Sequence, residues 1–141
     1  MVIDKNILDT LSNQAKANPR LRQGFDMRTT QDDSSQRLLN AMEPGTVMPI
    51  HRHRFTLETM TMVRGRLIER FYDDDGNLID EFLMEPMGQY PMIQVPVGMW
   101  HSLEVLESGT VIFEAKDGKY EPLVEEDIIQ LQNNTGKEYV E

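Results

Sequence analysis

The sequence has no cysteine, and it has only three histidines and one tryptophan among 141 residues. The absence of cysteine excludes disulfide bonds and thiolate metal ligands. No apolar run approaches the roughly 20 residues that cross a bilayer as a helix, and the N-terminus lacks the basic, apolar and small-residue regions of a secretory signal. We therefore expect one soluble domain in the cytoplasm, without a membrane partner.

Basic side chains are also few. Fourteen lysines and arginines stand against twenty-four aspartates and glutamates, which gives a net charge of −10. This charge repels phosphate backbones and anionic lipid surfaces. We therefore expect no nucleic-acid partner and look instead for a small-molecule ligand.

The pattern of apolar residues predicts one helix followed mostly by strands. Apolar side chains recur at helical spacing from Ile7 to Ala15, and Asp4 before them can cap a helix over roughly residues 4–17. Residues 23–35 are polar and lack a clear period, which indicates a loop or irregular edge structure.

Beyond this segment, glycine and proline turn signals separate short apolar or alternating runs. The clearest hairpin joins "RLIERFY" to "NLIDEFL" through a turn at Gly76. Such punctuation predicts an antiparallel sandwich or barrel. We expect residues 1–35 to form a helix and an irregular arm packed on the barrel, residues 36–122 to form the barrel, and residues 123–141 to form a short helix or polar tail.

Two of the three histidines stand in the stretch "HRHRFTLE". Counted from Gly45, the pattern is Gly-x5-His-x-His-x4-Glu-x6-Gly, which ends at Gly65. On an extended chain His51 and His53 point to the same face, and Glu58 joins them if the chain bends once. The third histidine closes a second pattern, Pro-x-Gly-x2-His, in "PVGMWH".

These two stretches resemble the paired motifs of the cupin superfamily, and the chain more narrowly resembles the WbuC family of cupin-fold metalloproteins. The resemblance runs from "IDKNILDTLSNQAKANPRLR" through "QRLLNAMEPGTVMPIHRHR" and "YDDDGNLIDE" to "VPVGMWHSLEVLESGTVIFEAKDGKYEP". It implies a mainly β protein, a double-stranded β-helix or cupin jelly-roll barrel with an N-terminal helix. It also implies one divalent metal ion held by His51, His53, Glu58 and His101, and a role near surface polysaccharide synthesis.

The second motif departs from the general cupin pattern. Tyr90 stands at the usual opening glycine, and Val105 stands at the usual closing asparagine. Neither position is a ligand, so the departure concerns loop geometry more than the metal.

Imidazole and carboxylate ligands suit iron, zinc, manganese, nickel or copper better than calcium or magnesium. Three imidazoles and one carboxylate leave open positions on an octahedral ion, which is typical of a catalytic centre. There are two alternatives: the barrel forms without an ion in its site, or the histidines are ordinary core or surface residues. The metal site is favoured because all three histidines stand at the motif positions.

Other residues are candidates for the pocket or the core. The alternation around "QRLLNAM" places either Arg37 or Asn40 among apolar neighbours, where a polar side chain needs a partner. The substrate-binding candidates are therefore Arg37, Asn40, Glu114 and Lys116, against the alternatives of a surface salt bridge and a solvated strand edge. Met60 and Met62 are expected in the core, and Trp100 is expected to face away from the site, against the helix or at a dimer contact.

Two functions remain open. The first is a small metalloenzyme acting on a carbohydrate or other small oxygenated metabolite, as an isomerase, an epimerase or, with iron, a dioxygenase. The three histidines are committed to the ion, so proton transfer would fall to metal-bound water, to Glu58 as a loose ligand, or to a group at the mouth, namely Glu114, Lys116, Tyr90 or Tyr120. The second is an accessory or ligand-binding cupin in polysaccharide assembly. A homodimer is expected in either case.

Overall fold

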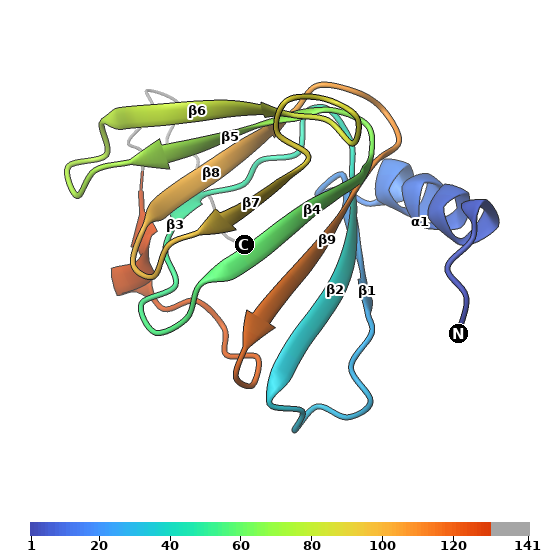
Figure 1. Cartoon of the computed structure of the whole chain (residues 1–141), viewed down its shortest axis with the longest axis horizontal. Helices are drawn as coiled ribbons and strands as arrows, with labels where there is room; N and C mark the ends of the chain where they lie inside the picture. The colour runs from blue at the N-terminus through green and yellow to red at the C-terminus, as the bar shows by residue number, and fades with distance from the viewer. Residues whose placement is uncertain (131–141) are drawn as a thin grey trace.

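The computed structural model describes residues 1–130, in which two antiparallel sheets face each other and one helix lies outside them (Figure 1). The first sheet has the strand order β1 (Arg22–Asp26), β2 (Ser35–Met42), β9 (Thr110–Asp117), β4 (Glu58–Arg64) and β7 (Met92–Val95). The second has the order β10 (Ile128–Ile129), β3 (Ile50–His51), β8 (Trp100–Val105), β5 (Leu67–Tyr72) and β6 (Leu78–Met84). Most strands that follow each other in the sequence therefore lie in different sheets.

The barrel core forms from the inward positions of these strands. On β4 and β5 every second side chain is buried, which is the two-residue period of a strand with one face on a core. The core side chains are Met42, Met60, Met62, Leu67, Phe71, Met84, Val95, Leu103, Val105 and Ile112. Met60 and Met62 are therefore core residues, as predicted.

Helix α1 (Lys5–Ala17) begins where the sequence predicts it. The Asp4 carboxylate accepts a hydrogen bond from the backbone N–H of Ile7 at 3.0 Å, which satisfies one of the free donors of the first turn. Leu11 and Ala15 of the helix pack on the outer face of the first sheet and form a second apolar cluster with Leu39, Ala41 and Val111. None of the helices within residues 1–130 has the length and apolar character to span a membrane.

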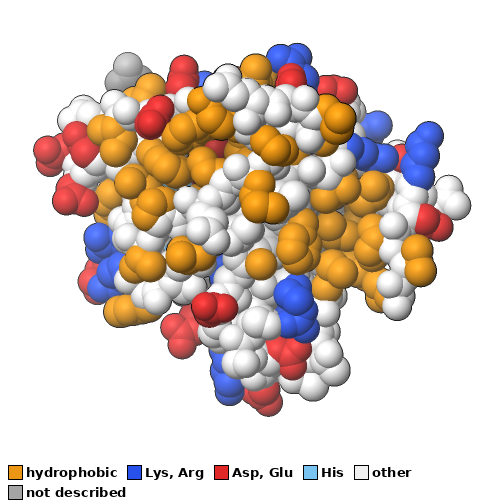
Figure 2. All heavy atoms as spheres, viewed as in Figure 1, with side chains coloured by type: hydrophobic (Ala, Val, Ile, Leu, Met, Phe, Trp, Pro, Cys, Tyr) orange, Lys and Arg blue, Asp and Glu red, His pale blue; other side chains and the backbone are white. Residues whose placement is uncertain are grey.

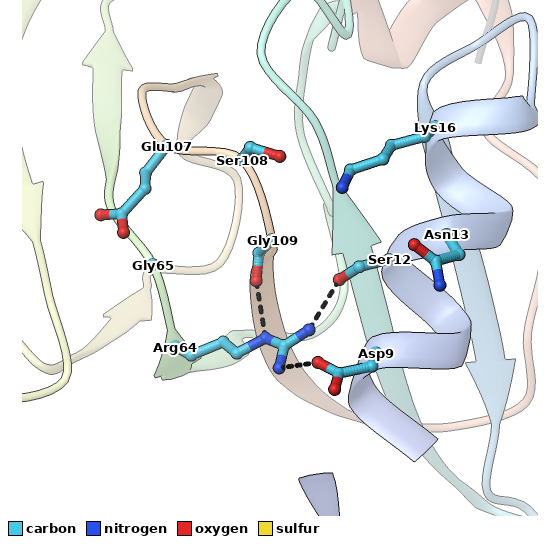
Figure 3. Close-up of a pocket in the computed structure, with 9 residues that line it drawn as sticks. All are labelled: Asp9, Ser12, Asn13, Lys16, Arg64, Gly65, Glu107, Ser108 and Gly109. Atoms are coloured by element: carbon cyan, nitrogen blue, oxygen red, sulfur yellow. Dashed lines mark hydrogen bonds and ion pairs between the residues drawn. The ribbon is translucent and has the colours of Figure 1, made fainter. Parts of the chain in front are cut away.

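Arg64 joins this helix to the barrel (Figure 3). Its Nε donates to the carbonyl of Gly109 at 2.8 Å, its Nη1 to Asp9 Oδ1 at 2.7 Å, and its Nη2 to Ser12 Oγ at 3.0 Å. These groups line a surface pocket of about 550 Å³. Because the guanidinium of Arg64 already donates to three protein groups, we assign Arg64 a structural role and do not assign a ligand to this pocket.

Three local expectations need adjustment. Part of the polar stretch after residue 22 forms the regular edge strand β1, because backbone pairing with β2 does not require apolar side chains. The segment after Pro122 forms a short 3-10 turn, η1 (Glu125–Asp127), and then β10; the expectation for residues 131–141 lies outside the described residues. Trp100 does face outward, but its Nε1 donates to Asp74 Oδ1 at 3.0 Å, and the helix packs on the other sheet.

Candidate metal centre

The two histidine motifs meet at one end of the barrel. His51 on β3 and His101 on β8 are opposite each other in the antiparallel register. Glu58 is the first residue of β4 in the facing sheet, and His53 lies in the loop between. One donor atom from each of the four residues lies within 4.8 Å of all the others. The structure therefore brings together all four ligands that the resemblance implies.

The loop that carries His53 is fixed from two sides. The backbone carbonyl of His53 accepts a hydrogen bond from the N–H of Gly98 at 2.8 Å. This bond links the first histidine motif directly to the second. Gly98 has a φ of +77°, a left-handed conformation that glycine adopts without strain.

Asp127 fixes the same loop from the C-terminal side. Its Oδ1 lies 3.1 Å from Nε of Arg52 and 2.7 Å from Nε of Arg54, the residues on either side of His53. Its backbone carbonyl accepts a hydrogen bond from the N–H of Arg52 at 3.0 Å. One carboxylate therefore holds both neighbours of a candidate ligand.

The hydrogen bonds of the imidazole rings fit a metal site. Nδ1 of His51 lies 2.9 Å from the carbonyl of Pro49, which can only accept, so this nitrogen carries the proton and Nε2 keeps its lone pair. Nδ1 of His101 lies 2.8 Å from Oε1 of the buried Glu69. Metal-bound histidines usually donate their second ring N–H to a carbonyl or carboxylate in this way.

Glu58 stands at the centre of the cluster. Its Oε2 lies 3.1 Å from Nε2 of His53 and 3.8 Å from Nε2 of His101. Burial alone would raise the pKa of this carboxyl, but the hydrogen bond with His53 and the nearby His101 hold the pKa below its usual range. Glu58 is therefore ionised, as a ligand must be.

His51 is held in its neutral form. Burial, together with the nearby His101, lowers the pKa of His51 to about 3. Two donors on opposite sides of an ion stand about 4 to 4.6 Å apart, given bonds of 2.0 to 2.3 Å, which matches the spacing of this cluster. The four residues thus fit one divalent transition metal ion.

Glu69 is a functional candidate that the sequence analysis missed. It is completely buried on β5, between the inward-facing Leu67 and Phe71. Burial and the nearby Glu58 raise the pKa of Glu69 well above its usual range. The alternation of "LIERF" contains the signal, because it places a carboxylate at an inward position of an otherwise apolar strand face.

A cavity of about 130 Å³ lies beside the four residues. Three of the predicted substrate-binding residues, Asn40, Glu114 and Lys116, line it. Asn40 lies on β2, and Glu114 and Lys116 lie on β9, which pairs with β2. Burial and the neighbouring Glu58 raise the pKa of Glu114 well above its usual range.

Arg37 is a correction to the predicted pocket. Its neighbours Gln36 and Leu38 line the cavity, so the two-residue period directs Arg37 to the opposite face of β2. There its Nη2 pairs with Asp33 Oδ2 at 3.1 Å, and its Nη1 bonds Ser35. The surface salt bridge, which was the alternative for this residue, is what the structure contains.

The cavity opens into an outer groove of about 500 Å³ between the His53 loop and the segment after β9. Four residues line both spaces, namely Gln36, His53, Lys116 and Tyr120. Arg22 lines the inner cavity from β1, and its Nη1 donates to the carbonyl of Val47 at 2.8 Å. Arg22 was not predicted, because nothing in the polar stretch around it marks an inward position.

Residues 3–84 match the family described as Domain of unknown function (DUF6016). The protein belongs to this family. The match includes His51, His53 and Glu58 and ends before His101. No curated protein sequence matches this DUF6016 protein significantly.

Several solved structures resemble the DUF6016 protein. The capsular polysaccharide assembling protein CapF from Staphylococcus aureus is 22% identical, with a TM-score of 0.58 over 70% of this chain and 27% of CapF. KdgF from Halomonas sp. is 14% identical, with a TM-score of 0.58 over 73% of this chain and 84% of KdgF. The Schizosaccharomyces pombe Cnp3 cupin domain is 12% identical, with a TM-score of 0.55 over 70% of this chain and 65% of that domain.

At these identities the likeness establishes the fold. The DUF6016 protein has a cupin jelly-roll barrel with an N-terminal helix, which confirms the predicted fold class. It spans about a quarter of the length of CapF.

Proposed function

We propose that this protein is a WbuC-type, metal-dependent cupin that acts on a carbohydrate or other small oxygenated metabolite in surface polysaccharide synthesis. His51, His53, Glu58 and His101 would hold the ion. The observation that carries the proposal is the convergence of their four donor atoms within 4.8 Å beside a cavity that opens to the surface. A bound divalent ion would supply a Lewis acid that polarises an oxygen of the ligand.

The protein groups around the cavity favour an enzyme over an accessory protein. Glu114 is hydrogen-bonded to Glu58 without being one of the four candidate ligands, and it can hold a proton at a half-buried position in the cavity wall. A carboxyl of this kind can give or take a proton at a ligand carbon or oxygen. We therefore favour an isomerase or epimerase reaction, with Glu114 as the acid–base group.

The likeness to CapF supports the biological setting. That protein is described as assembling capsular polysaccharide, and the WbuC resemblance of this chain implies a related setting. The analogy between this protein and CapF rests on the barrel fold that the two share.

The metal content of the protein, purified without added metal, tests this function. We expect close to one transition metal ion per chain in the wild type and little metal in His51→Ala, His53→Ala or His101→Ala. Glu104→Gln, an exposed change on β8, is the control and should keep its metal. Metal-free wild-type protein that also fails to bind added iron, zinc, manganese or nickel would refute the proposal.

We also propose that two copies pair through the exposed sheet edges. The edge strands β6 and β7 expose apolar side chains, and hydrophobic atoms gather over this part of the surface (Figure 2). The residues are Leu78, Ile79, Leu83 and Met92. Sedimentation should show a dimer that Ile79→Lys dissociates, whereas a monomeric wild type would refute the pairing.

A further inference from the structure

The inner cavity contains a cation that the candidate metal site does not use. Lys116 is half-buried on the inner face of β9, directly opposite Glu58 on β4 and Gln36 on β2. Within residues 1–130 its ammonium group forms no hydrogen bond and no ion pair. Its charge acts at longer range on Glu58 and Glu114, whose pKa values it lowers. A half-buried ammonium that lines a cavity without a direct hydrogen bond or ion pair can still donate to a ligand.

The balance of charge in the cavity points to an anionic ligand. The basic residues that line it are Arg22 and Lys116, and the acidic ones are Glu58 and Glu114. With Glu114 ionised these four formal charges balance, and with Glu114 protonated they leave one positive charge. In either state the charge of a divalent ion would remain uncompensated. An anion entering this cavity would be attracted to both the ion and Lys116, although the whole chain carries a net charge of −10.

The size of the cavity limits what can enter. An apolar cavity of about 150 Å³ holds one benzene molecule, which has six non-hydrogen atoms. The inner cavity has about 130 Å³, so only a small head group fits there. A carboxylate with the adjacent hydroxyl-bearing carbon has this size and presents two oxygens to one ion.

The outer groove has room for the remainder of such a molecule. It has about 500 Å³ and begins at Lys116 and Tyr120, which line both spaces. Tyr120 and Phe55 are exposed along it and offer aromatic faces to a carbon skeleton. The side-chain amide of Asn40, at the inner cavity, forms no hydrogen bond within residues 1–130 and can bind a hydroxyl.

We propose that the ligand is a hydroxy-carboxylate of the sugar-acid type, whose carboxylate end enters the inner cavity and is recognised by Lys116. This inference rests on the function proposed above and specifies its substrate class. Lys116 discriminates between an acid and a neutral sugar of the same shape, and the hydroxylated chain lies in the outer groove.

Calorimetric titration of cobalt-loaded protein tests the inference. The probes are D-gluconate and D-gluconamide, which share one carbon skeleton and differ in the charge of the head group. We expect wild-type protein to bind gluconate at least about tenfold more tightly, because a charge-assisted contact is formed only with the acid. Lys116→Met should lose the part of this preference that Lys116 provides and keep only the part due to the cobalt ion, and Lys116→Arg should keep much of it. The control is Lys16→Met, an exposed change on α1 that should behave as wild type.

The cobalt content of every sample is measured as well, so that failure of the metal site can be told apart from failure of the substrate class. If cobalt is bound and gluconamide binds as tightly as gluconate, or neither probe binds, the substrate class is wrong and the metal site stands. The substrate class is also wrong if Lys116→Met, with full cobalt and a cooperative thermal transition, keeps the full wild-type preference for gluconate. If the wild type binds gluconate through Lys116 but holds no cobalt, the proposed function fails and the anion site stands. A wild type that binds neither cobalt nor gluconate overturns both.

Discussion

His51 and His101 face each other across two antiparallel strands, with their ring centroids 4.2 Å apart. Two cationic imidazoles at this distance in a buried site would repel each other strongly. The two rings therefore cannot both be charged without a large cost in stability, and His51, whose pKa is lowered, is the one that stays neutral.

Metal-free protein should lose stability on the acid side of pH 6.5 because of His51. Its pKa is about 3 in the folded chain and near 6.5 when unfolded. Between these two pH values the unfolded state binds a proton at His51 and the folded state does not. The free energy of unfolding is therefore highest above pH 6.5 and falls toward pH 3, at no more than about 1.4 kcal/mol per pH unit. Urea unfolding with chelator at pH 7 and pH 5 measures the loss. His51→Ala should show a smaller decrease, and an equal decrease would contradict the assignment.

Glu69→Gln should weaken metal binding while the barrel still folds. The Glu69 carboxyl lies 2.8 Å from Nδ1 of His101 and orients the ring, and the amide keeps the shape of the side chain but cannot ionise when the metal binds. Changes at such positions typically cost about 10- to 100-fold in metal affinity. Competition with a chromogenic chelator gives the affinity, and Glu81→Gln on the exposed strand β6 is the control. Wild-type affinity in Glu69→Gln would show that this contact does not support the site.

Asp127→Asn should loosen the loop around His53. Loss of the charge weakens the contacts at 3.1 Å and 2.7 Å with Arg52 and Arg54, and the loop then samples positions in which the imidazole points away from the ion. We expect a metal affinity several-fold lower, about half a kcal/mol to 1.5 kcal/mol, with little change in the unfolding transition of the metal-free protein. Glu126→Gln, on the neighbouring and more exposed residue, is the matched control. Equal metal affinities in the two variants would argue against a specific role for Asp127.

Arg64→Met should reduce stability and leave metal binding intact. The substitution removes two hydrogen bonds between the barrel and α1 and one to the carbonyl of Gly109, at the opposite end of β4 from Glu58. We expect a loss of about 1 to 3 kcal/mol in the free energy of unfolding. Denaturant unfolding measures it, with Arg66→Met, a more exposed arginine paired with Glu85, as the control. A fall in metal content of the folded variant would contradict the structural role given to this contact.

The sequence predicts the parts of this site that depend on short-range spacing. The two-residue spacing of His51 and His53 and the glycines around them belong to local turns and strands, which a motif records directly. The inward period of β4 likewise places Met60 and Met62 correctly.

Contacts between distant segments are not recorded in such motifs. Asp127 reaches the His53 loop because β10 pairs with β3, and each of these strands has only two residues, too few to show a period. Arg37 was misplaced for a different reason. The alternation identifies two faces of β2, but only the packing of α1 and of the second sheet decides which face is inside.

The candidate ligands come from both sheets, and nearly fifty residues separate His53 from His101 in the chain. Because joining such distant segments costs conformational entropy, we expect this closure to come late in folding. A growing or partly folded chain can therefore present His51 and His53 to a metal ion, but it lacks the third imidazole that completes the set. Metal uptake should follow closure of the barrel, so that the rate of metal incorporation reports the slowest step of folding.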